Sequence, residues 1–194
     1  MTNNPGRPRS VEPDTVLAAA MRVFRMRGYE ATTMKHLERA TGLLSGSLHH
    51  AFGGKRALFL AALEHYNAHV VRARIELYLK GESPVEELRA LFRSTLDEPG
   101  GGHHGCLLTN TAVELAAGPK PVRAKVSQGL GALLEAFEGQ ARLASPGKSA
   151  GVQARTALRL LHAYQGLLVL VRFGHPRAEL EALIDDMIHD ILRR

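Results

Sequence analysis

The sequence contains a single cysteine, Cys106, and no long run of apolar residues. One thiol cannot form an internal disulfide framework, which argues against a disulfide-stabilised secreted domain. The uninterrupted apolar runs, such as Leu167 to Val171, are all far shorter than the roughly 20 residues that span a bilayer. No small-residue cleavage site follows the first apolar stretch, which Arg22 interrupts, so a secretory signal is not expected. We therefore expect a cytoplasmic protein with no membrane segment.

Motifs typical of enzymes are also missing. The glycine-rich stretch GGGHHG lacks the lysine and the preceding strand of a phosphate-binding loop. Cys106 with His103 or His104 supplies two parts of a Cys/His catalytic site, but no residue is recognisable that would orient the base. We therefore expect no enzyme and no cofactor, and a Cys/His enzyme stays a minor alternative.

A complete set of metal ligands cannot be recognised in the sequence either. His65 and His69 lie four residues apart, which is the spacing of two ligands on one face of a helix. No Cys/His quartet or carboxylate cluster completes a site around them. Solvated or core-edge histidines are the simpler interpretation, and we expect no metal ion.

Positive charge is concentrated near the N-terminus. The formal net charge is +6, and residues 1–60 hold nine basic side chains against four acidic ones. The rest of the chain is close to neutral. A basic segment joined to a near-neutral one is typical of a nucleic-acid-binding module with a partner domain. A solubilising surface with chance clustering is the alternative.

The spacing of apolar residues predicts helices almost everywhere and no convincing strand. The first helix has Pro13 in its first turn and Gly28 at its C-terminal stop. Thr32 or Thr33 can cap a short second helix that Gly42 ends. The other predicted helices are 45–51, 55–79, 84–96, 106–117, 121–143, 153–173 and 176–192.

The second and third predicted helices are joined by the turn Ala40-Thr41-Gly42-Leu43. Three short helices in about forty residues, with a glycine in the turn, are typical of a helix-turn-helix unit. Gly42 can adopt the left-handed conformation that lets the chain reverse sharply. The residues expected to pack inward are Phe24, Leu37, Leu48 and Phe52. The polar side chains of the third helix then face outward and are small enough to enter a DNA major groove.

The stretch FRMRGYEATTMKHLERATGLLSGSLHHAFGGKRALF resembles the signature of the tetracycline-repressor (TetR) family of bacterial transcriptional regulators. The family pattern runs F-x-x-x-G-Y-x-x-T-T, then a helix, A-G-V-S-x-G-S-L-Y-x-H-F and K-x-x-L. The match covers about residues 11–60 and fixes many positions in register. The resemblance implies an all-α fold, with an N-terminal three-helix helix-turn-helix DNA-binding domain and a C-terminal helical bundle for ligand binding and dimerisation.

These implications define a domain division and a function. We expect a flexible basic arm over residues 1–10, the helix-turn-helix domain over 11–54, and the ligand-binding and dimerisation domain over 55–194. The resemblance implies a sequence-specific repressor that a small-molecule or thiol-reactive effector releases from a palindromic operator. The expected partners are double-stranded operator DNA, the effector and a second copy of the chain. A non-specific architectural DNA-binding protein is the alternative, and it would leave the near-neutral part without an evident role.

The resemblance also places the DNA contacts. They are Thr33, Ser45, Gly46, Ser47, His49, His50 and Lys55. Hydroxyl groups, N–H groups at a helix start and a lysine suit phosphates, and Ser47 or His50 could reach base edges. The sequence departs from the family pattern at two positions, where Leu44 replaces a serine and His49 replaces a frequent tyrosine. Leu44 cannot cap the third helix, so we expect Ser45 to cap it.

The leading segment PGRPR adds two further candidate DNA contacts, Arg7 and Arg9. It resembles the Gly-Arg-Pro core that lies in narrow A·T-rich minor grooves. A basic tail that raises affinity without adding specificity is an equally good interpretation. Both arginines are therefore assigned to the DNA interface, with their mode of binding open.

The last two predicted helices carry more apolar surface than one buried face needs. In the TetR family the C-terminal helices form a four-helix dimer interface, so the resemblance implies a homodimer. An ordinary monomer core is the alternative, although paired DNA half-sites favour a two-fold symmetric protein. The predicted interface residues are Leu161, Leu168, Val171, Ile184, Met187 and Ile191.

Cys106 is the leading candidate for an effector site because it is predicted to begin a helix after a histidine-containing loop. The helix dipole and those histidines would favour a reactive thiolate, as in an electrophile or oxidant sensor. A small buried hydrophobe is the alternative. Asn110, one turn later, is expected to line the effector pocket, with Phe92 and Tyr164 as its apolar and polar walls.

Overall fold

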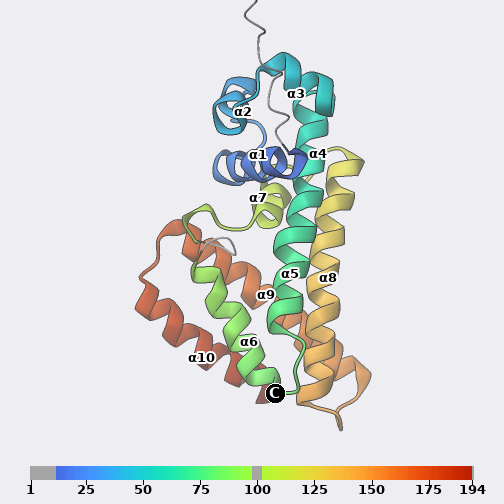
Figure 1. Cartoon of the computed structure of the whole chain (residues 1–194). Helices are drawn as coiled ribbons and strands as arrows, with labels where there is room; N and C mark the ends of the chain where they lie inside the picture. The colour runs from blue at the N-terminus through green and yellow to red at the C-terminus, as the bar shows by residue number, and fades with distance from the viewer. Residues whose placement is uncertain (1–11, 98–101, 194) are drawn as a thin grey trace, which may run out of the picture.

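The computed structural model describes residues 12–97 and 102–193, and over these residues it contains helices and no strand (Figure 1). The predicted all-α fold is therefore confirmed. The α-helices are α1 (Pro13–Arg27), α2 (Met34–Thr41), α3 (Ser45–Phe52), α4 (Lys55–Tyr66), α5 (Ala73–Tyr78), α6 (Pro84–Arg93), α7 (Leu107–Glu114), α8 (Lys120–Ala144), α9 (Ala150–Phe173) and α10 (Arg177–Arg193). A π-helical segment, Asn67–Arg72, joins α4 to α5, and 3-10 turns cover Ser94–Leu96 and Gly102–His104.

The helices form two groups along the length of the molecule (Figure 1). Helices α1 to α3 lie together at one end, and α4 runs from this end beside α8 into the larger group. In that group α9 packs against α8 and α10, and α10 packs against α6. Helix α7 contacts α1, α4 and α8, so it lies where the two groups meet. None of the described helices has both the length and the apolar character needed to cross a membrane.

Local signals determine the ends of the first helices. Thr33 caps α2 through a reciprocal pair, in which its hydroxyl accepts from the His36 N–H and its own N–H donates to His36 Nδ1. Of the two predicted caps, Thr33 is therefore the one used. Gly42 ends α2 in the left-handed region with a φ of 72°, as the turn required.

The core of the helix-turn-helix unit includes part of α4. Phe24, Leu37 and Leu48 are completely buried, as predicted, and the partly buried Phe52 packs against them. The ring of Phe59 from α4 lies 4.8 Å, between centroids, from that of Phe24. Helix α4 therefore belongs to the core of the N-terminal group as well as to the bundle, and the predicted boundary at residue 54 stays a prediction.

The predicted uninterrupted helix over residues 55–79 is wrong in one respect, because a π-helical segment divides it. The buried Asn67 begins this segment and donates from Nδ2 to the Lys125 carbonyl of α8 at 2.9 Å. Gly129 of α8 lies directly against the Asn67 side chain, where a Cβ atom would clash. The wider turn therefore coincides with a polar contact between two closely packed helices, and such a contact has no signature in the local sequence.

Candidate nucleic-acid interface

Helix α3 is oriented by one buried residue. Leu48 is completely buried against the helix-turn-helix core, so the opposite side of this eight-residue helix faces outward. Gly46, Ser47, His49 and His50 are exposed there, and Ser45 is half-buried. Apart from its chain neighbours and the backbone of its own helix, nothing lies within 4 Å of the position that a Cβ of Gly46 would occupy. The outward face of α3 is therefore small, polar and unobstructed near its N-terminal end.

The N-terminus of α3 is capped differently from the expectation. Ser45 is the first helical residue, and its N–H donates to Glu38 Oε1 of α2 at 2.5 Å. The expectation that Ser45 caps α3 is therefore wrong, because the Glu38 carboxylate from the preceding helix accepts from the helix N-terminus instead. Leu44 occupies the cap position without a side-chain cap and is largely exposed.

Two predicted contacts flank α3. Thr33 is exposed at the start of α2, although its hydroxyl is engaged in the cap. Lys55 begins α4, and its Nζ lies 4.4 Å from the centre of the Tyr29 ring and 3.4 Å from the Glu30 carbonyl oxygen. The Tyr29 ring therefore positions Lys55, which sequence reasoning did not anticipate. The predicted contacts Arg7 and Arg9 lie outside the described residues.

Helix α7 is joined to the helix-turn-helix unit at several points. The buried Arg25 of α1, only 1% exposed, donates from Nε to the Gly105 carbonyl at 2.7 Å. The Asn110 amide donates to the carbonyls of Arg25 and His104, each at 3.0 Å. The Glu114 carboxylate accepts from the N–H groups that follow α1, those of residues 29 and 30, at 2.9 and 2.8 Å. A movement of α7 would therefore be transmitted to α1.

Two of the predicted effector residues lie at this junction. Cys106 is the N-cap residue of α7 and is only 4% exposed, which matches the alternative of a small buried hydrophobe. The buried Tyr66 is its neighbour, and burial, followed by Cys106, raises the pKa of Tyr66 well above its ordinary value. Asn110 lines a surface groove with residues of α1, α7 and α9.

The other two predicted effector residues lie deeper in the bundle. The Tyr164 ring is 5.2 Å from Phe92 and 5.8 Å from Phe137, measured between centroids. Its hydroxyl accepts from Arg74 of α5, a residue that sequence reasoning missed. Burial raises the pKa of Tyr164 to about 12. The structure therefore brings Phe92 and Tyr164 together as predicted, but in a packed cluster.

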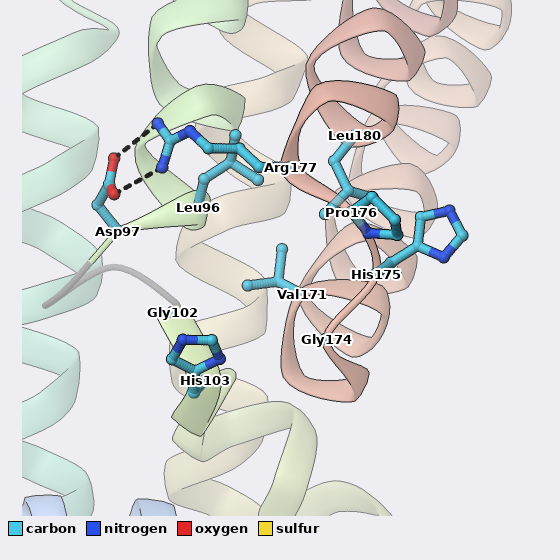
Figure 2. A pocket seen from close by; sticks show the side chains of 10 residues that line it. All are labelled: Leu96, Asp97, Gly102, His103, Val171, Gly174, His175, Pro176, Arg177 and Leu180. Carbon is cyan, nitrogen blue, oxygen red and sulfur yellow. Dashed lines mark hydrogen bonds and ion pairs between the residues drawn. The ribbon is translucent and has the colours of Figure 1, made fainter.

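A separate pocket of about 420 Å³ lies at the turn between α9 and α10 (Figure 2). At its edge, Arg177 donates from two nitrogens to the two Asp97 oxygens, at 2.8 and 3.2 Å. The hydrogen bond from Arg177 lowers the pKa of Asp97. None of the four predicted effector residues lines this pocket.

The predicted dimer interface needs correction at three positions. Leu168, Val171 and Ile184 are buried within the chain itself and offer almost no surface to a partner. Leu161, Met187 and Ile191 are partly buried. The large apolar side chains that α9 and α10 leave exposed are Leu158, Val169, Phe173 and Leu183. An apolar sequence around most of a helix does not indicate which part packs against α8, and this explains the error.

The histidine pair has a neighbour that lies far away in the sequence. The rings of His65 and His69 lie 4.2 Å apart between centroids, and Asp14 Oδ1 is 4.0 Å from His65 Nδ1. Burial, followed by the charge of His69, lowers the pKa of His65, whereas Asp14 acts in the opposite direction. Sequence reasoning missed Asp14 because only the packing of α1 on α4 brings it here.

Three short helices with an outward-facing third helix, attached to a larger helical bundle, define a helix-turn-helix protein with a second helical domain. Residues 16–62 match the family described as bacterial regulatory proteins, tetR family. A cysteine mutant of the TetR family transcriptional regulator CifR, complexed with 26bp double-strand operator DNA, is 30% identical with a TM-score of 0.77. That likeness covers 94% of this chain and 98% of the other. This chain belongs to the TetR family.

Two curated relatives are also regulators. The HTH-type transcriptional repressor ComR of Escherichia coli (strain K12) is 30% identical over 118 residues, which are 57% of this chain and 54% of ComR. The transcriptional regulator AcuR of Cereibacter sphaeroides is 31% identical over 130 residues, which are 61% of this chain and 58% of AcuR. The matched part of this chain thus spans only a little more than half of the length of these relatives.

Proposed function

We propose that this protein is a sequence-specific DNA-binding transcriptional repressor, and not an enzyme, that acts as a homodimer in the cytoplasm. The main support for this proposal is the outward face of α3. Leu48 holds the helix in place, and the exposed Gly46, Ser47 and His50 form a surface small enough to enter a major groove. The CifR complex with operator DNA supports this assignment, because the two chains are alike over nearly their whole length.

Each part of the interface has a chemical role. Ser47 and His50 carry the donors and acceptors that read base edges, whereas Thr33 and Lys55 face the phosphates on either side. Arg7 and Arg9 extend the contact into the minor groove or along the backbone. Because Glu38 already accepts from the Ser45 N–H, the contact of Ser45 with DNA uses its hydroxyl. In a dimer, the two α3 helices bind half-sites about 34–36 Å apart, or a small multiple of that distance.

Dimerisation uses the surface that α9 and α10 leave uncovered. The proposed interface consists of Leu158, Leu161, Val169, Phe173, Leu183, Met187 and Ile191. Several of these side chains are large, apolar and exposed on two neighbouring helices, as a symmetric helical interface requires. Leu168, Val171 and Ile184 support the same helices from inside the chain.

Replacing Leu158 with aspartate is expected to dissociate the dimer. Leu158 is 58% exposed on α9, so the substitution leaves the fold of the chain intact but places a charge inside the interface without a partner. Sedimentation velocity should show the dimer of the native protein and a monomer for the variant. Leu77→Asp is the matched control, because Leu77 is a leucine 71% exposed on α5 and is not part of the proposed interface. A dimeric Leu158→Asp variant would contradict the proposed interface.

An effector releases the repressor by binding unequally to two states of the dimer. Helix α7 is the element that connects these states, because Cys106 is its N-cap residue and its residues Asn110 and Glu114 bind to α1 and to the backbone that follows α1. We place a non-covalent effector in the interior beside Phe92, Tyr164 and Cys106, where binding would separate the aromatic cluster. A thiol-reactive effector reaches Cys106 only after the start of α7 moves, since the thiol is buried.

The DNA upstream of the protein's own gene provides the first test. Fluorescence anisotropy with excess non-specific competitor, at two salt concentrations, should show binding that survives the competitor. Binding that the competitor removes from every fragment would favour the architectural alternative instead.

Treatment with a mild electrophile, with Cys106→Ser as the control, separates the two kinds of effector. If the electrophile releases the native protein from DNA but not the Cys106→Ser variant, the effector acts covalently on the thiol. If DNA binding is unchanged by the electrophile and by the loss of the thiol, the search turns to non-covalent ligands.

A further inference from the structure

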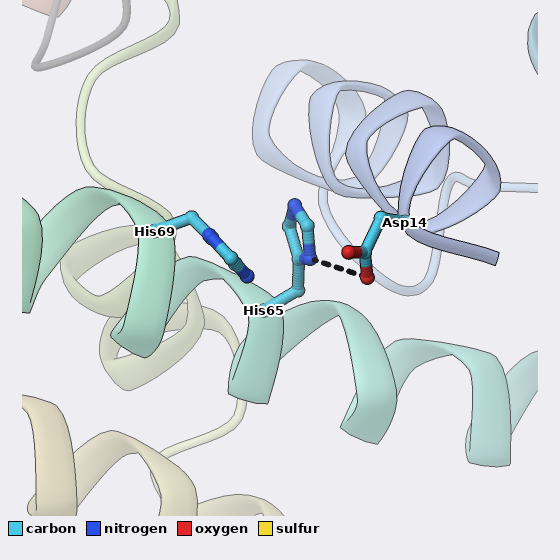
Figure 3. Close-up of side chains that lie close together, drawn as sticks. All are labelled: Asp14, His65 and His69. Atoms are coloured by element: carbon cyan, nitrogen blue, oxygen red, sulfur yellow. Dashed lines mark ion pairs between the residues drawn. The ribbon is translucent and has the colours of Figure 1, made fainter. Parts of the chain in front are cut away.

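Asp14, His65 and His69 form a cluster at the seam between the helix-turn-helix unit and the bundle (Figure 3). Asp14 lies in the first turn of α1, His65 in the last turn of α4, and His69 in the π-helical segment. One ligand atom from each residue can be chosen so that all three lie within 4.8 Å of one another. The cluster takes no part in the proposed DNA contacts or in the contacts of α7.

We propose that Asp14, His65 and His69 bind one divalent late transition-metal ion, for which Zn²⁺ is the best fit. Imidazole nitrogen and carboxylate oxygen are ligands that Zn²⁺ prefers, whereas Mg²⁺ and Ca²⁺ favour sites made of oxygen atoms. Three protein ligands leave the fourth position of a tetrahedral site to water or to a small anion. The three residues therefore supply an open site that is accessible to the solvent.

The distances fit such a site after small side-chain rotations. Ligand atoms about 2.0–2.1 Å from a tetrahedral zinc lie roughly 3.4 Å from one another. The observed distance between His65 Nδ1 and Asp14 Oδ1 is 4.0 Å. The His65 side chain is only 10% exposed and is held by packing, whereas that of Asp14 is 79% exposed. His69 is also exposed, so the two outer ligands can rotate toward a fixed His65.

The backbone supports this arrangement at two places. Helix α1 packs extensively on α4, which fixes the start of α1 beside His65. The π-helical segment begins two residues after His65 and determines where His69 lies, and π turns inside helices are frequent at functional sites. A bound ion would therefore connect the first turn of the DNA-binding unit to the helix that leads into the bundle.

Metal titration of the tag-free, full-length protein tests the proposal without any DNA. The native protein is expected to bind one Zn²⁺ per chain by calorimetry and to give the visible absorption bands of tetrahedral Co²⁺, which Zn²⁺ then displaces. Asp14→Asn and His69→Asn should each weaken Zn²⁺ binding at least about tenfold, since loss of even a supporting residue costs that much. Circular dichroism should show that both variants stay folded, because both side chains are exposed.

The control variant is His189→Asn, which removes an exposed histidine of α10 and should leave the affinity for Zn²⁺ unchanged. Unaltered Zn²⁺ affinity in Asp14→Asn and His69→Asn would overturn the proposal and assign the metal to adventitious histidine pairs, such as His49 with His50. Absence of saturable binding in the native protein would also overturn it. DNA binding, measured separately with and without Zn²⁺, shows independently whether the protein recognises an operator, so the two proposals fail separately.

Discussion

Glutamate in place of Gly46 is expected to lower the affinity for operator DNA at least about 100-fold, because it adds bulk and negative charge where the helix enters the groove. Gly46 is exposed in the first turn of α3, and the space beyond its Cα is empty. The new side chain therefore strains nothing in the free protein. On DNA, it would push α3 away from the base edges and repel the phosphates.

Fluorescence anisotropy at fixed salt measures this loss, and thermal unfolding verifies that the variant is folded. Gly131→Glu is the matched control. Gly131 is also exposed and helical with empty space beyond its Cα, but it lies on α8 in the bundle. It adds the same charge to the protein, so any difference between the two variants reports the position of α3. Equal affinities for the operator would show that α3 does not enter the groove.

The second large effect is expected at Arg25. Arg25→Met keeps most of the aliphatic stem but removes the donor to the Gly105 carbonyl, which is buried between α1 and α9. A buried hydrogen bond from a charged group contributes about 1.5–3 kcal/mol, so the free energy of unfolding should fall by a similar amount. For a chain of this size, the midpoint of thermal unfolding should fall by roughly 2–4 °C for each kcal/mol lost.

The control for this variant is Arg22→Met, one turn earlier on the same helix and exposed to solvent. It removes the same charge, and its effect on stability should be within about 0.5 kcal/mol. Chemical unfolding with urea provides the comparison. If the two variants lose equal stability, the Arg25 side chain does not anchor α1 to the bundle, and the connection from α7 to the DNA-binding unit would have to run through Asn110 and Glu114 instead.

Features encoded within one or two turns were predictable from the sequence. Thr33 and Gly42 bound α2 because a cap and a left-handed residue act on their immediate neighbours. The burial of Leu37 and Leu48 followed from helical spacing in short amphipathic helices. The all-α fold and the outward face of α3 depend on such local signals. The function was predicted separately, from the resemblance of about residues 11–60 to the TetR family signature.

Features that depend on packing between distant segments were not predictable. Arg25 adds to the positive charge of the N-terminal segment, yet its side chain is buried and donates to the Gly105 carbonyl. The sequence did not predict this contact, because Gly105 lies eighty residues away. Asp14 approaches His65 for the same kind of reason. The buried and exposed sides of α9 were assigned incorrectly at Leu168 because α8 and α10 decide between them. The spacing of apolar residues shows that a helix has an apolar face, but it does not show which other element packs against that face.

The π-helical segment makes the chain unusually tolerant of the loss of one residue at this point. A turn closed by i→i+5 hydrogen bonds contains one residue more than an α turn, so deleting one residue within Asn67–Arg72 would let the backbone rewind as an ordinary helix. Because one full α turn would replace one full π turn, α5 would keep roughly its present angle around the axis relative to α4. Arg74 would then still face Tyr164 and the Leu91 carbonyl. A one-residue deletion here would therefore disturb the bundle less than a deletion inside α4 or α8, where the loss of one residue turns the rest of the helix by about 100°.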